Sequence, residues 1–231
     1  MEKIPEYNAR YIRSAHKFVE GELTIRDVCA PCNNGPLSEL DSYICQLYDA
    51  QFHRIARARQ PQTFVYCYEL LLRWLLKISY NSSRANHSNV NLLSRYKEFI
   101  LKGGSPPQEV QVRLELVHPS PIPKHVHGSA SRDVIPPQSV RCSRVELPNC
   151  PISGVTVRMV AINSYYFWIV FTPFGAETAV LEAALRGKKL FPTKKRLSLF
   201  STRGMLEPHR DWVLDEKASE SMQMFRARTG R

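Results

Sequence analysis

The chain of 231 residues is 43% hydrophobic and 23% charged, a composition typical of a soluble globular protein with room for one large or two modest domains. No apolar segment follows Met1, and the longest apolar stretch, residues 64–80, is too short and too charged to span a bilayer, so neither a secretory signal nor a membrane span is expected. The 32 Lys and Arg residues exceed the 21 Asp and Glu residues, and the net charge of +11 favours a polyanionic partner such as nucleic acid. We therefore expect a cytoplasmic protein without membrane contact.

Helical periodicity dominates the first hundred residues. Apolar side chains recur every three or four residues after position 36 (Leu37, Leu40, Ile44, Leu47 and Tyr48), which predicts a helix from about Leu37 towards Arg59, with Ser38 able to cap it. Residues 64–80 are apolar nearly all round, the pattern of a central buried helix. A third, shorter helix is expected over residues 91–101, closed by Gly103 and Gly104.

Strand and turn signals follow from Glu109 onward. Residues 109–117 alternate apolar and polar side chains, which predicts a strand with one face in the core. Further strands are expected over residues 140–147, 155–162 and 164–171, with a hairpin turn at Asn163 and Ser164. An irregular loop is expected over residues 119–137 and a short helix over residues 176–185.

The stretch CAPCNNGPLSELD, which begins at Cys29 and ends at Asp41, indicates a metal site. Two cysteines two residues apart can direct both sulfurs at one tetrahedral ion, and the Asn-Asn-Gly that follows is a tight-turn signal. The six cysteines are otherwise spread widely, which favours a reducing compartment over a disulfide framework. A complete zinc site needs two more ligands.

Residues 14–43 resemble the second half of the zinc-bearing HNH endonucleases, in which a strand leads into CxxCN and then a helix. The resemblance implies that His16 acts as general base on the attacking water and that Asn33 helps to hold magnesium or another divalent ion. It also implies that Cys29 and Cys32 are ligands of a structural zinc. These residue types suit phosphodiester hydrolysis, because an imidazole can deprotonate water and a divalent ion can neutralise the charge that develops on the leaving oxygen.

The combined patterns predict an α+β fold. A helical amino-terminal part with a ββα-like CxxC knuckle is expected over residues 1–103, a mainly antiparallel, sheet-rich part over residues 104–214, and a polar tail over residues 215–231. Similar helices follow the knuckle in HNH-like bacterial and phage proteins. The amino-acid sequence does not determine the oligomeric state.

The zinc site that the resemblance implies is incomplete, because no cysteine precedes Cys29. The missing ligands would come from His16, Cys45, the sheet-rich region or sequence upstream of Met1, or the site has been lost and the knuckle is a remnant. Two functions follow: a metal-dependent endonuclease that acts on DNA, and a non-catalytic nucleic-acid-binding or protein-interaction module that keeps an eroded zinc knuckle.

Two basic segments are candidates for contacts with the phosphate backbone of nucleic acid. The alternative interpretation of each segment is a charged face that contacts only solvent. They contribute eight candidate residues: Arg54, Arg57, Arg59, Lys188, Lys189, Lys194, Lys195 and Arg196.

Overall fold

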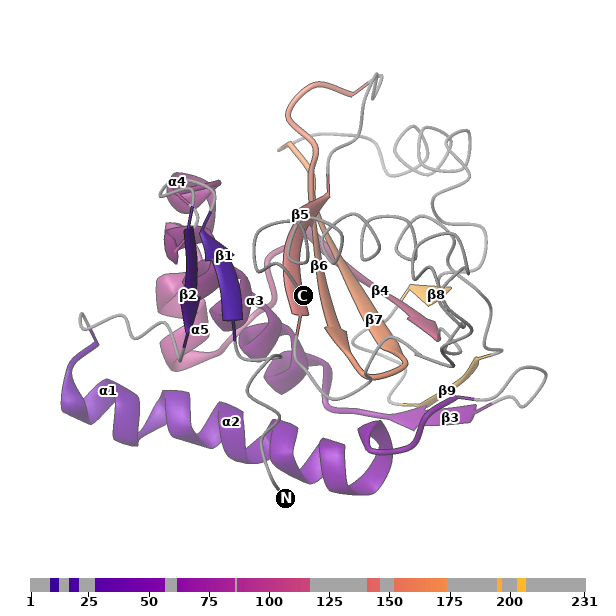
Figure 1. The fold of residues 1–231 in the computed structure, drawn as a ribbon. Coiled ribbons are helices and arrows are strands. Elements are labelled where there is room, and N and C mark those ends of the chain that lie inside the picture. Colours follow the sequence, from indigo (N-terminus) through magenta and orange to yellow (C-terminus); the bar gives the residue numbers. More distant parts are fainter. Residues whose placement is uncertain are drawn as a thin grey trace, which may run out of the picture.

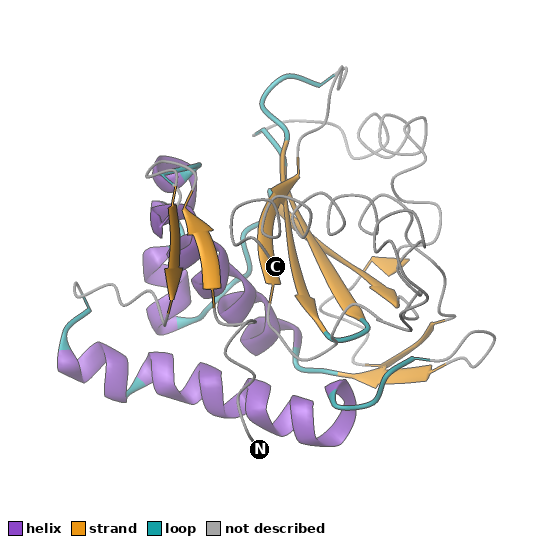
Figure 2. Cartoon of the chain, viewed as in Figure 1, coloured by secondary structure: helices purple, strands orange, loops and turns teal. Residues whose placement is uncertain are grey.

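The computed structural model describes residues 9–12, 17–20, 28–56, 62–85, 87–116, 141–145, 152–173, 195–196 and 203–206. Helices from the amino-terminal part pack against one face of an antiparallel sheet from the carboxy-terminal part (Figures 1 and 2), so the predicted α+β class is confirmed. Within this described part, no helix combines the length and the apolar character needed to cross a bilayer. The loop expected over residues 119–137, the helix expected over residues 176–185 and the polar tail lie outside the described residues.

The amino-terminal helices follow a short antiparallel hairpin of β1 (Ala9–Ile12) and β2 (Lys17–Glu20). Helix α1 (Ala30–Asn34) leads directly into α2 (Pro36–Leu47), which continues as the π-helical turn η3 (Tyr48–Phe52). Helix α3 (Tyr68–Ala85) lies between α2 and the sheet (Figure 1), and α4 (Val90–Ser94) and α5 (Lys97–Lys102) complete the set. The helix expected over residues 91–101 is thus two short helices, and Gly103, in the left-handed region at φ 73°, ends the second.

Helix α2 buries Leu37, Leu40, Ile44 and Leu47, as the periodicity predicts, but leaves Tyr48 exposed. Its start also differs from the prediction, because the cap position is Gly35 and the first helical residue is Pro36. Proline suits that position, since its ring presets the helical φ and it lacks an N–H that would have no partner there. Ser38 is inside the helix, and its carbonyl accepts a hydrogen bond from the Ser42 hydroxyl.

The helix that continues α2 ends at Phe52 rather than near Arg59. A continued α-helix would include a hydrogen bond from the Ala56 N–H to the Phe52 carbonyl. Both groups are bound instead by the turn between β6 and β7: Asn163 Nδ2 donates to the Phe52 carbonyl at 2.6 Å, and the Ala56 N–H donates to Ser164 Oγ at 2.9 Å. A tertiary contact therefore replaces one of the hydrogen bonds that a continued helix would form.

The apolar segment of residues 64–80 is not one helix. Its first residues form β3 (Gln62–Val65), which pairs with β9 (Arg203–Leu206), and α3 begins only at Tyr68. Phe64 is buried and Val65 is exposed, an alternation that fits a strand. Phe64 packs in an aromatic cluster with Phe52, Tyr165 and Phe167, with ring centroids 4.8 to 6.0 Å apart.

The main sheet has the strand order β5-β6-β7-β4-β8, and every neighbouring pair is antiparallel. Strands β4 (Val110–Leu116), β5 (Arg141–Val145), β6 (Thr156–Ile162) and β7 (Tyr165–Phe171) confirm the four predicted strands, and β8 (Lys195–Arg196) adds a short edge. The predicted turn at Asn163 and Ser164 joins β6 to β7, and Asn163 has the positive φ of 50° that such a tight turn requires.

Both faces of the central strands are buried. One face of β4, with Val112 and Leu114, packs on the helices, and its cross-strand partners Ile169 and Phe167 share that core. The alternation predicts one face in the core, but the polar face is buried as well: Gln111, Arg113 and Glu115 are buried, and Glu115 accepts a 2.6 Å hydrogen bond from the Trp168 indole. The polar side chains of β4 thus alternate with apolar ones without facing water.

Candidate functional site at the start of the helices

The two cysteines of the CxxC sequence lie at the first turn of α1. Cys29 is the cap residue, with φ −64° and ψ 149°, and is exposed, and Cys32 follows inside the helix and is half-buried. The Asn33 N–H donates to the Cys29 carbonyl at 3.0 Å, and the Gly35 N–H donates to the Pro31 carbonyl at 3.0 Å. The Asn-Asn-Gly sequence is therefore the end of a helix and not the tight turn that we expected.

The two thiols interact directly, and the interaction shifts their pKa values in opposite directions. Hydrogen bonds from the Cys32 side chain and then from the Cys32 backbone N–H lower the pKa of the Cys29 thiol below its ordinary value. The side-chain hydrogen bond to Cys29 raises the pKa of the Cys32 thiol, because Cys32 is the donor. Cys29 is therefore the thiol that more readily becomes a thiolate, which is the form that binds metal and attacks electrophiles.

The pair can supply two sulfur ligands to a soft metal ion. The described residues contain no group of three or more His, Cys, Asp or Glu side chains placed to hold a metal. Cys45 lies exposed on α2 and does not join the pair in such a group. A tetrahedral zinc site at Cys29 and Cys32 would therefore need ligands from elsewhere in the chain or from a partner.

The other residues predicted for catalysis are placed only in part. Asn33 lies in α1 directly after Cys32, with an exposed side chain. His16 falls in the connection between β1 and β2 and lies outside the described residues. The structure thus puts Asn33 beside the cysteine pair and leaves the position of the proposed base as a prediction.

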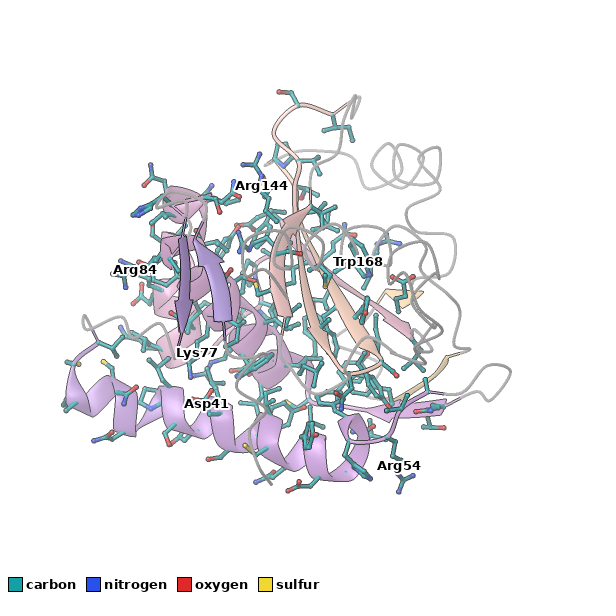
Figure 3. The ribbon with its side chains drawn as sticks, in the orientation of Figure 1. Asp41, Arg54, Lys77, Arg84, Arg144 and Trp168 are labelled. Atoms are coloured by element: carbon teal, nitrogen blue, oxygen red, sulfur yellow. The ribbon has the colours of Figure 1, made fainter. Side chains whose placement is uncertain are left out.

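Of the basic residues predicted for nucleic acid, only Arg54 has a side chain within the described part of the chain, and it does not lie at the cysteines. Arg54 is exposed just beyond η3, at the end of the α1–α2–η3 axis opposite to Cys29 (Figure 3). Lys195 and Arg196 form β8, although their side chains are outside the described part. Five further candidates lie outside the described residues altogether: Arg57, Arg59, Lys188, Lys189 and Lys194.

A polar contact between α2 and α3 holds the start of α2. The Lys77 ammonium donates to Asp41 Oδ2 at 2.6 Å and to the Leu37 carbonyl at 3.0 Å, and the Trp74 indole donates to Asp41 Oδ1 at 3.1 Å. Asp41 and Lys77 point towards each other from the two helices in Figure 3. The contact therefore ties α2, the helix that follows the cysteine-bearing α1, to α3.

Two arginines that sequence reasoning missed lie on adjacent strands of the sheet. Arg158 on β6 and Arg144 on β5 are directly opposite each other in the strand pair. Arg158 is 1% exposed, and Arg144 is exposed at the sheet edge (Figure 3). The sequence signal is an arginine inside the otherwise apolar strand TVRMVAI, but alternation alone does not show that its face is covered.

Comparisons of this chain with known protein families, with curated proteins and with solved structures found no match.

Proposed function

We propose that this chain is an HNH-type, metal-dependent endonuclease that hydrolyses phosphodiester bonds in DNA. The observation that carries the proposal is the order of the elements: an antiparallel hairpin of β1 and β2 precedes a helix whose first turn bears Cys29, Cys32 and Asn33. This is the ββα order of the family that the sequence resembles. The net charge of +11 supports a polyanionic substrate.

The residues take the roles that the resemblance gives them. His16 accepts the proton of the attacking water, and the Asn33 amide oxygen is a neutral ligand for magnesium, adequate where phosphate oxygens and water complete the coordination. Cys29 and Cys32 are two of the ligands of a structural zinc, whose thiolate donors suit that metal. The basic segments around Arg54 and Lys195 hold the phosphate backbone.

The proposal is tested by nicking of supercoiled plasmid DNA in the presence of magnesium or manganese. We expect the wild-type chain to nick the plasmid and His16→Ala to be inactive. His87→Ala, which removes an exposed histidine between α3 and α4, is the matched control and should retain activity. Nicking that persists in His16→Ala would remove the proposed base.

A second candidate is a nucleic-acid-binding or protein-interaction module without catalytic activity, in which the cysteine pair is a remnant. It is favoured by the observation that no third ligand joins Cys29 and Cys32 among the described side chains. Metal content separates the two candidates. About one zinc per chain in the wild type, lost in Cys29→Ser/Cys32→Ser but kept in the exposed Cys67→Ser control, supports a working zinc site, and no zinc supports the remnant.

Both the endonuclease and the nucleic-acid-binding version of the module bind nucleic acid. This binding has its own test. Affinity for a DNA duplex should fall steeply between about 50 and 200 mM salt, because phosphate contacts release counterions. Replacement of Arg54, Arg57 and Arg59 with Gln should reduce the slope of log K against log salt by about 0.9 for each phosphate that the variant no longer neutralises. A flat salt response would mean that the partner is not nucleic acid.

A further inference from the structure

The helix-facing side of the sheet contains two adjacent arginines at its β5 edge. Cross-strand partners share a face, so Arg158, its partner Arg144 and Cys142, the neighbour of Arg144 on that face, all project towards the side that packs on α3. Like charges directly opposite each other on a sheet repel, so this pairing destabilises the folded chain unless a negative charge lies with it.

The guanidinium of Arg158 is buried and only partly hydrogen-bonded. Its Nη2 donates a hydrogen bond to Ser82 Oγ on α3 at 3.1 Å and a second to the Cys142 sulfur at 3.7 Å. Nε and Nη1 are both buried and have no hydrogen-bond partner in the part of the chain that the structure describes. Among the described residues, neither Arg158 nor Arg144 forms an ion pair with a carboxylate.

A guanidinium keeps its charge at every physiological pH, so Arg158 cannot relieve its burial by losing a proton. Buried charges in proteins are paired or hydrogen-bonded, because removal of an ion from water carries a large penalty. A hydroxyl and a thiol are neutral, so the hydrogen bonds from Nη2 compensate only part of that penalty. What the described residues do not supply to this site is a negative charge with several acceptor atoms.

The surrounding side chains favour a phosphate oxyanion. Ser79 lies three residues before Ser82, on the same face of α3; it is 0% exposed, and its hydroxyl has no partner among the described residues. Arginine N–H groups pair with carboxylate and phosphate alike, but the three or four oxygens of a phosphate group can also accept from the serine hydroxyls. On the same face of β5, Arg144 is exposed and Cys142 is half-buried.

We propose that Arg158 and Arg144, together with the serines of α3, form a binding site for a phosphate group at the β5 edge of the sheet. Two sources supply the same chemistry: free inorganic phosphate and the backbone phosphate of nucleic acid. The nucleic-acid source rests on the proposed function above, whereas the free-phosphate source does not.

The test is a thermal-shift titration of the whole chain with sodium phosphate, against sodium chloride at matched ionic strength. A ligand that binds only the folded state raises the melting temperature in a saturable way. We expect such a rise for the wild type and an apparent affinity weakened about tenfold or more in Arg144→Gln, because that variant loses a charge-assisted hydrogen bond. Arg95→Gln removes another exposed charge, between α4 and α5, and should respond as the wild type does.

Arg158→Met gives a second, independent readout. If the Arg158 charge is uncompensated in the free protein, its replacement by an apolar side chain should leave the melting temperature without phosphate unchanged or higher, and should abolish the response to phosphate. The proposal is overturned if phosphate acts no differently from chloride, if Arg144→Gln and Arg95→Gln respond alike, or if Arg158→Met melts well below the wild type without phosphate.

A parallel titration with a DNA duplex identifies the source of the phosphate. Weaker DNA binding by Arg144→Gln than by Arg95→Gln assigns the site to backbone phosphate. Phosphate binding that depends on Arg144, with no DNA binding by the wild type, keeps this site and removes the proposed function. DNA binding that is insensitive to Arg144, with no phosphate response, keeps the proposed function and removes this site.

Discussion

The Lys77 ammonium lies 2.6 Å from a carboxylate oxygen of Asp41, and this ion pair connects α3 to the helix that follows the cysteines. The Lys77 side chain is only 12% exposed, whereas that of Asp41 is 56% exposed. The lysine therefore depends on its partner more than the aspartate does. Removal of Asp41 leaves a nearly buried ammonium with one carbonyl as its acceptor and leaves the Trp74 indole without its acceptor.

Asp41→Ala should lower the free energy of unfolding by about 1 to 2 kcal/mol, since two hydrogen bonds are removed but solvent screens the exposed carboxylate. Urea denaturation of the wild type and the variant measures the change. Glu39→Ala, at an exposed position of the same helix, is the control and should alter stability little. Equal stability of the two variants would mean that the Asp41 contact contributes nothing.

Cys29 should react with iodoacetamide faster than Cys32 at neutral pH. The hydrogen bonds from Cys32 lower the pKa of the Cys29 thiol, and this raises its thiolate fraction at any pH below the ordinary value. Peptide mass spectrometry after brief alkylation gives the two rates. Cys32→Ala should slow the reaction of Cys29, because the donor is removed; an unchanged rate would show that Cys32 does not activate it.

Gly103→Ala should destabilise the chain by about 1 to 3 kcal/mol. Gly103 has φ 73°, and an added Cβ would meet the Glu69 carboxylate and then the Arg73 guanidinium, which hydrogen-bonds the Ile100 and Leu101 carbonyls. Gly104→Ala is a matched control, since its φ is also positive but no described atom lies within 4 Å of its Cβ position. The difference in stability between the two variants measures the effect of the contact apart from that of backbone strain. Equal stability would mean that the contact with Glu69 and Arg73 does not destabilise Gly103→Ala.

Stability should fall as the pH rises through the range from about 10 to 12. Burial, and then the neighbouring Glu109 carboxylate, raise the pKa of Tyr96 to about 12 in the folded chain. The unfolded chain loses this proton near pH 10, so above that pH the unfolded state binds fewer protons and is favoured. Thermal melts from about pH 9 to 12 should show a smaller decline for Tyr96→Phe than for the wild type. An equal decline in both would mean that Tyr96 is not one of the groups responsible.

The strands of the main sheet were predictable because their residues carry the signal locally. Period-two alternation indicates a strand in β4. The β-branched and aromatic residues of β6 and β7 indicate strands there, without reference to the rest of the chain. The burial of Arg113 and Glu115 was not predictable, because it depends on what covers the second face of the sheet. Sequence alternation reports two faces and does not say that both are covered.

The errors at helix ends have a different physical origin. Residues 64–67 belong to an apolar run that continues into α3, so composition does not reveal where the strand ends and the helix begins. The partner strand β9 also lies far along the chain. The cysteine pair was evident from the sequence as a pair, but its position at a helix start was not, because Pro31 and Gly35 resemble turn residues. The Arg158 site was missed because burial of an arginine is decided by tertiary packing.

Asn163 and Ser164 form hydrogen bonds with the Phe52 carbonyl and the Ala56 N–H. These bonds have a consequence for synthesis of the chain on the ribosome. The groups that these two bonds join are separated by 111 and 108 residues. At elongation rates of about 5 to 20 residues per second, the end of η3 waits roughly 5 to 20 s for its partner turn to be made. During that interval Phe52 lacks the aromatic partners Tyr165 and Phe167, so the nascent helices present an unfilled hydrophobic surface to whatever binds emerging chains.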